Sequence, residues 1–193
     1  RGRAELRREW FENGAAGDLL CLSGAMSGDI GAAIAAGNVE QAEQLAADWA
    51  RLFPGAFYIE IQRAGHPGTE TYIRHAVDIA GRLGLPVVAT HPVQFLERDD
   101  FKAHEARVCI AQGYVLADKR RPRDFTEEQY LKSQAEMCEL FADLPEALEN
   151  AVEIARRCSL TVQLGKNFLP LFPTPAGMPL DDFLVQEAKS GLE

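Results

Sequence analysis

The amino-acid sequence predicts an α/β fold in which helices surround a parallel β-sheet or barrel. Three apolar runs rich in β-branched or aromatic residues, over residues 19–23, 57–61 and 86–89, are expected to form buried strands. Amphipathic helical patterns separate these runs. Because strands that alternate with helices usually belong to βα units, the three strands are expected to lie parallel.

Four helices are expected in the first half of the chain, over residues 1–11, 30–36, 38–52 and 70–83. The first is charged and ends at Asn13-Gly14, and the second follows a turn at residues 27–29. The third begins at Asn38, with Gln41 at the position of a capping box. Gly84 ends the fourth helix.

The second half of the chain is mainly helical in pattern. A helix over residues 101–112 is followed by a loop over 113–123 that contains the basic cluster 119–123. Two short helices are predicted from capping signatures, namely Thr126 with Gln129 and Ser133 with Glu136. A longer helix is expected to begin at Pro145 and to end near Cys158.

The C-terminal residues are expected to form a separate part of the chain. A last strand is predicted over residues 160–164, a proline-rich extended connector over 169–175, and an amphipathic helix over 180–192. We therefore expect two domains, residues 1–167 and residues 168–193. Because the sequence starts with Arg1 and ends within a helical pattern, we expect a piece of a longer protein.

Composition argues against several functional classes. The 193 residues are 47% apolar and 25% charged, as in an ordinary soluble globular domain, and their net charge is −9. An acidic surface does not suit binding to a phosphate backbone, so direct binding to nucleic acid is not expected. The four widely spaced cysteines favour free thiols in a cytoplasmic protein over zinc or disulfides. No apolar run has membrane-spanning length.

The turn Thr90-His91-Pro92 is the place where we expect chemistry. It directly follows the third predicted strand, and functional groups of α/β proteins gather at the carboxyl ends of parallel strands. Pro92 keeps His91 out of the helical region. Glu60 and Gln62 are expected to line the same rim. A carboxylate at Glu60 that faces inward needs a partner, such as Arg63 or a water molecule.

Several sequence runs occur in a familiar order: Leu22-Ser23-Gly24 with Gly28-Asp29, and residues 57–62, 84–90, 103–105, 136–147 and 168–173. Together they resemble the PHP (polymerase and histidinol phosphatase) domain of bacterial DNA polymerase III alpha subunits, over nearly the whole chain. The resemblance implies the later part of a distorted β/α barrel related to the TIM barrel, with parallel strands inside and helices outside. It also implies a metal site at the carboxyl ends of the strands.

The sequence departs from the metal-binding members of this family. The resemblance implies that their Asp and His ligands correspond to Pro92, which has no donor atom, and Gln94, which is a weak neutral ligand. His91 lies one residue too early, and Arg63 would add a positive charge beside a cation. No catalytic residue and no metal site are therefore predicted, with His91 and Glu60 as the only weak candidate ligands. The pocket rim is predicted to comprise Glu60, Gln62, Arg63, His91 and Gln94.

The resemblance implies a non-catalytic role in the alpha subunit. The segment would support the thumb and palm and offer a docking surface to the proofreading exonuclease subunit, with other holoenzyme subunits as further partners. The parent would be a DNA-directed DNA polymerase of the bacterial cytoplasm that uses magnesium and contacts DNA elsewhere. The segment by itself is expected to need no cofactor and to be inactive.

Two other functions remain open from the sequence. The first is a PHP phosphoesterase, either a 3′–5′ exonuclease or a pyrophosphatase, with zinc, manganese or iron at His91, Glu60 and ligands outside this chain. Pro92 and Gln94 argue against it. The second is an unrelated α/β hydrolase-like domain, which the ordered motifs disfavour. His104 is expected to be a packing or capping group, and the cluster 119–123 a solvated loop.

The missing first strands of the implied barrel have a physical consequence. They would leave open sheet edges and an uncovered apolar interior. We therefore expect the isolated piece to associate or to contain flexible segments.

Overall fold

A computed structural model describes residues 7–12, 16–167, 172–175 and 177–192. The chain divides into two compact units, Arg1–Cys158 and Ser159–Glu193, and each is considered by itself below. Among the described residues, no helix is both long enough and apolar enough to cross a membrane.

The first unit contains a three-stranded parallel sheet in the order β1-β2-β3. The strands are β1 (Cys21–Leu22), β2 (Phe57–Gln62) and β3 (Val87–Thr90). Cys21 pairs with Phe57 in register, and Gln62 pairs with Thr90. The three predicted strands and their parallel order are thus confirmed, although β1 is only two residues long. The described residues form an open sheet, and a closed barrel remains a prediction.

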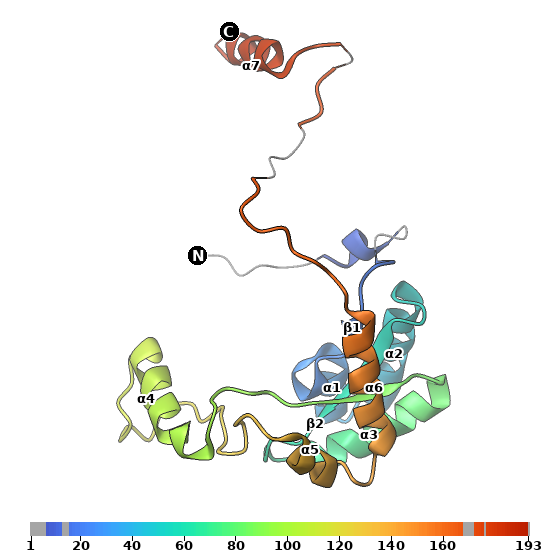
Figure 1. The fold of residues 1–193 in the computed structure, drawn as a ribbon, viewed down its shortest axis with the longest axis vertical. Coiled ribbons are helices and arrows are strands. Elements are labelled where there is room, and N and C mark those ends of the chain that lie inside the picture. The colour runs from blue at the N-terminus through green and yellow to red at the C-terminus, as the bar shows by residue number, and fades with distance from the viewer. Residues whose placement is uncertain (1–6, 13–15, 168–171, 176, 193) are drawn as a thin grey trace. The chain divides into compact units, whose positions relative to one another are not determined.

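Helices follow the strands as the alternating pattern predicts (Figure 1). The α-helices of the first unit are α1 (Asp29–Ala35), α2 (Val39–Leu52), α3 (Thr69–Leu83), α4 (Phe101–Gln112), α5 (Gln134–Leu140) and α6 (Pro145–Arg157). Short 3-10 helices are η1 (Arg8–Phe11), η2 (Ala25–Ser27) and η3 (Arg98–Asp100). The second unit contains α7 (Leu180–Ser190).

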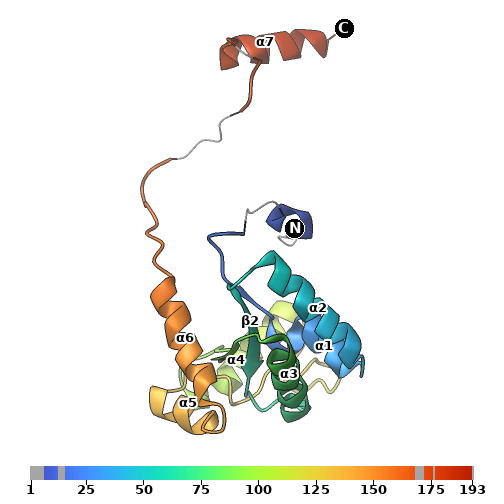
Figure 2. The ribbon, with the colours of Figure 1, turned by 90° about the vertical axis from the view of Figure 1, so that its right-hand side faces the viewer.

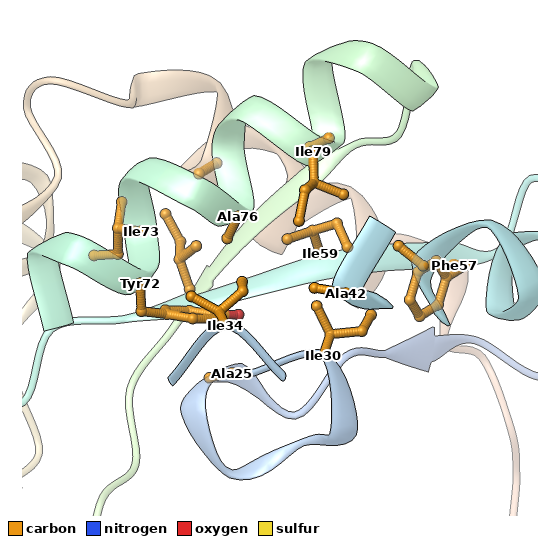
Figure 3. Close-up of a cluster of buried hydrophobic side chains, with 14 of the residues drawn as sticks. Ala25, Ile30, Ile34, Ala42, Phe57, Ile59, Tyr72, Ile73, Ala76 and Ile79 are labelled. Carbon is orange, nitrogen blue, oxygen red and sulfur yellow. The ribbon is translucent and has the colours of Figure 1, made fainter. Parts of the chain in front are cut away.

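The sheet is covered on both sides. Figure 2 shows α1, α2 and α3 on one side of β2, and α5 and α6 on the other. The amphipathic faces of α1, α2 and α3 meet the apolar residues of β2 in the main core (Figure 3). Ile30, Ile59 and Ile79 are fully buried there. Asn150 of α6 donates to the Val87 carbonyl at 2.8 Å, which fastens α6 to the outer strand β3.

Close packing after β1 requires glycine at two positions. A Cβ on Gly28 would lie 1.9 Å from the Ser23 carbonyl oxygen, and one on Gly31 would lie 2.3 Å from the Ala25 carbonyl oxygen. Both contacts are with backbone atoms, so neither can be relieved by a side-chain rotation. These glycines allow α1 to pack tightly against η2 and Ser23, which directly follow β1.

The predicted helix caps have mixed outcomes. Ser133 and Glu136 form the predicted capping box at α5. The prediction of a capping box at Asn38 is wrong, because the Asn38 side chain makes no capping hydrogen bond. The helix predicted after Thr126 is not formed. Gln129 N donates to the Thr126 carbonyl oxygen at 3.3 Å, which makes a single turn. Tyr130 then pairs with Phe95 in an isolated β-bridge, so the turn does not continue as a helix.

The two ends of the chain differ from the prediction. The first helix, predicted over residues 1–11, is found only as the 3-10 helix η1 in the described residues. Residues 1–6 of the predicted helix and its expected end at Asn13-Gly14 lie outside the described residues. The strand predicted over residues 160–164 is wrong, because these residues are in no helix or strand. The helix predicted over residues 180–192 is confirmed as α7, while residues 169–171 of the predicted connector lie outside the described residues.

Candidate functional site

The carboxyl ends of β2 and β3 hold a closed network of polar side chains. Gln62 Nε2 donates to Glu60 Oε1 at 3.0 Å and to Thr90 Oγ1 at 2.9 Å. The Thr90 hydroxyl in turn donates to Glu60 Oε1. Glu60 and Gln62 lie on the same face of β2 because they are two residues apart, and Thr90 is the register partner of Gln62. The network therefore follows directly from strand pairing.

Further groups hold Glu60 in place. Its second oxygen, Oε2, accepts from the Gly24 backbone N–H at 3.1 Å. Its own backbone N–H donates to Ser23 Oγ at 2.9 Å, and its carbonyl oxygen accepts from the Tyr72 hydroxyl at 2.7 Å. Burial raises the pKa of Tyr72 to about 12, so its hydroxyl remains a donor at neutral pH. Both carboxylate oxygens of Glu60 are thus used by the protein itself.

Arg63 does not pair with Glu60, and the proposed partnership is wrong. Successive strand residues point to opposite faces, so Arg63 leaves β2 on the side away from Glu60. Its guanidinium donates to Glu70 at 2.9 and 3.0 Å and to Asp143 at 2.6 and 2.9 Å. It also donates to the Leu140 carbonyl at 2.7 Å. Arg63 therefore joins α3 to the end of α5 rather than facing a cation site.

His91 lies at the expected place after β3 but is already bonded. Its Nε2 is 2.8 Å from the Glu128 carbonyl oxygen, which makes Nε2 the protonated nitrogen of the neutral ring. Its Nδ1 is buried without a hydrogen-bond partner. Burial lowers the pKa of His91, and the nearby Lys132 ammonium acts in the same direction. His91 thus acts as a neutral tether for the segment around Glu128.

A cleft of about 530 Å³ opens beside this network. It is lined by Met26, Ser27, Gln62, Ala64, His66, Pro67, Thr69, Pro92, Gln94, Asp124 and Gln129. Of the five predicted rim residues, Gln62 and Gln94 line it. Arg63 lines a neighbouring cleft of about 500 Å³, which shares His66 and Thr69 with the first cleft. Gln129 closes one wall by donating to the Pro92 carbonyl at 3.2 Å.

These residues do not fit the metal site that the sequence resemblance implies. Pro92 has no side-chain donor atom, Glu60 has both oxygens engaged, and the free nitrogen of His91 is buried against protein. In the described part of the chain, no three His, Cys, Asp or Glu side chains are grouped so that they could hold a metal ion. The arrangement suits hydrogen bonding within the protein, and no hydrolytic step follows from it.

Three contributors were not foreseen from the sequence. The sequence places Ser23 only within a PHP-like run, Thr90 only in the turn after the third strand, and Thr126 only in a capping signature. Thr126 instead donates to the Ala64 carbonyl and so joins its segment to the loop after β2. The pairing of Thr90 with Gln62 could have been found from strand register, because both are the last residues of neighbouring parallel strands.

His104 and the basic cluster behave as structural groups. His104 is 5% exposed and packs edge-on against Phe125, with ring centres 4.6 Å apart. Burial lowers its pKa, and the Arg107 guanidinium beside it has the same effect. Within the cluster, Arg121 pairs with Glu105 of α4 at 2.6 Å, and Arg120 pairs with Asp118 at 2.8 Å.

Comparison with known proteins gives one consistent result. Residues 1–64 match the PHP domain family. The chain is 56% identical over 191 residues to a DNA polymerase III subunit alpha of Neisseria meningitidis. The aligned region covers 98% of this chain and 17% of that protein. It is 50% identical over 192 residues to the Pseudomonas aeruginosa subunit and 49% identical over 175 residues to that of Escherichia coli K12. The chain spans only about a sixth of the length of these relatives.

Proposed function

Since this chain is related over nearly its whole length to a segment of DNA polymerase III alpha subunits, we propose that it is a non-catalytic PHP segment of a replicative polymerase. Its role is structural, in a DNA-directed DNA polymerase of the bacterial cytoplasm that uses magnesium elsewhere. The segment supports the polymerase domains and provides a docking surface for the proofreading exonuclease subunit. Other holoenzyme subunits are further partners.

The hydrogen bonds of Glu60 are the observation that supports the non-catalytic role best. A carboxylate has about four lone pairs, and three of those of Glu60 accept hydrogen bonds, from Gly24, Gln62 and Thr90. Breaking these bonds would leave half-buried polar groups without partners in the protein, at a cost of at most about 1–3 kcal/mol for each group. The rim is therefore built to hold β1, β2 and β3 together.

The non-catalytic role is tested with the full-length polypeptide, purified free of the exonuclease subunit. We expect no 3′–5′ exonuclease or pyrophosphatase activity that depends on zinc, manganese or iron. The control is the His91→Ala variant, assayed in parallel. A metal-dependent activity that is present in the wild type and lost in His91→Ala would contradict the proposal and favour a phosphoesterase.

The docking role is tested separately, by cross-linking the full-length polypeptide to the exonuclease subunit. The exposed lysines of this chain provide the reporters, which are Lys102, Lys119, Lys166 and Lys189. We expect at least one of them to be cross-linked to the exonuclease in the purified complex. A complex in which all cross-links fall outside residues 1–193 would contradict docking and leave the non-catalytic role intact.

A further inference from the structure

Residues 160–164 have the sequence of a strand but lie exposed. Apolar Leu160, Val162 and Leu164 alternate with polar Thr161 and Gln163, which is the period of a strand with one buried face. The three apolar residues are 89%, 66% and 88% exposed, respectively. Isolated apolar residues at a surface are common, but a regular row on one face of a short segment points to a missing cover.

The backbone of this segment is also without partners. Within the described part of the chain, residues 160–164 lie in no helix or strand and take part in no hydrogen bond. A strand gains its hydrogen bonds only from a neighbouring strand, so a strand pattern cannot form a strand by itself. The segment contains no charged residue and no proline, the two features that usually protect a strand from pairing.

We propose that residues 160–164 form a docking strand, which adds to the edge of a β-sheet in the remainder of the polypeptide. The inference rests on the proposed function in one respect, because it requires the chain to continue as its relatives do, which are about six times longer. An existing sheet edge would satisfy the backbone and cover the apolar face together. A second copy of the segment is a weaker occupant, since a two-stranded ribbon of this length is only marginally stable.

Hydrogen exchange of the backbone amides, followed by mass spectrometry, tests this pairing. In the 193-residue chain the amides of residues 160–164 should exchange at nearly the rate of an unfolded peptide. In the full-length polypeptide the same amides should exchange ~100-fold more slowly or slower still. Equal, fast exchange in both proteins would overturn the proposal. Protection in the 193-residue chain that increases with concentration would also overturn it, in favour of a second copy.

Two variants of the full-length polypeptide distinguish pairing of residues 160–164 as a one-sided strand from general burial of this segment. Val162→Asp places a charge on the apolar face and should remove the protection of residues 160–164. Thr161→Asp places the same charge on the polar face and should leave the protection unchanged. Equal loss in both variants would contradict the one-sided strand. None of these results depends on metal binding or on the exonuclease subunit, so they are independent of the tests of the proposed function.

Discussion

Among the five residues that the sequence places at the pocket rim, Arg63 is the one whose substitution by methionine is expected to destabilise the protein most. Arg63 makes five hydrogen bonds to Glu70, Asp143 and the Leu140 carbonyl, and its guanidinium carbon lies 5.1 Å from the centre of the Phe141 ring. Its side chain is 14% exposed, whereas those of the two carboxylates are 64% and 59% exposed. Methionine keeps part of the packing and removes every charged contact.

The magnitude follows from these exposures. The charged bond to the half-buried Leu140 carbonyl is worth roughly 1.5–3 kcal/mol. Each ion pair with a largely exposed carboxylate adds at most about 1 kcal/mol, and the contact with Phe141 adds about 1 kcal/mol. We expect Arg63→Met to lower the free energy of unfolding by about 3 kcal/mol, allowing for partial compensation by the methionine side chain.

The effect should also depend on pH. The hydrogen bonds from Arg63 hold the pKa of Asp143 below its usual 3.8. A carboxyl group whose folded pKa is depressed stabilises the protein above its unfolded pKa and loses that contribution as the pH falls through the folded value. The difference between wild type and Arg63→Met should therefore be largest near neutral pH and should decrease below the unfolded pKa of Asp143.

Urea unfolding followed by circular dichroism measures both effects. The matched control is Arg82→Met, because Arg82 also joins two helices through an ion pair, to Glu43 at 2.8 Å, but is 49% exposed. The control should cost no more than about 1 kcal/mol. Equal losses at the two positions, or a loss at Arg63 that is independent of pH, would refute the assignment of Arg63 as the link between α3 and α5.

Four further substitutions test other parts of the account by urea unfolding. Thr90→Val should cost about 1–2 kcal/mol, because it removes the hydroxyl that joins Gln62 to Glu60; no loss would contradict the network. Ser133→Ala should cost about 1 kcal/mol through the loss of the α5 cap, whereas Asn38→Ala, at a position without a side-chain cap bond, should be nearly neutral. Burial lowers the pKa of His104, so the folded protein resists protonation of this ring and loses stability as the pH falls below the ordinary pKa of 6.5. His104→Phe should weaken this dependence of stability on pH. An unchanged dependence would contradict the role of His104.

Local patterns predicted the elements that depend on local contacts. Gly84 and Gly113 end α3 and α4 in the left-handed conformation, as glycine after a helical pattern indicates. Ser133 and Glu136 cap α5 because the capping box needs only four consecutive residues. The parallel sheet was likewise predictable, since the strands alternate with helices.

The failed predictions depend on groups that are distant in the sequence. Thr126 carries a capping signature, yet its hydroxyl bonds to Ala64, and the following residues pair beside Phe95. Residues 160–164 have a strand pattern but lack a neighbouring edge in the described chain. Arg63 was one of two partners suggested for Glu60, the other being a water molecule, but its guanidinium donates to Glu70 and Asp143 instead. In each case the outcome was decided by a partner that spacing alone does not reveal.

The metal content of the full-length polypeptide tests the central claim most directly. The protein would be freed of loosely bound ions by gel filtration and analysed for zinc, manganese and iron by mass spectrometry, beside the His91→Ala and Glu60→Gln variants. The closed hydrogen-bond network around Glu60 predicts that all three proteins contain far less than one of these ions per polypeptide. One tightly bound ion per wild-type polypeptide, lost in either variant, would contradict the account.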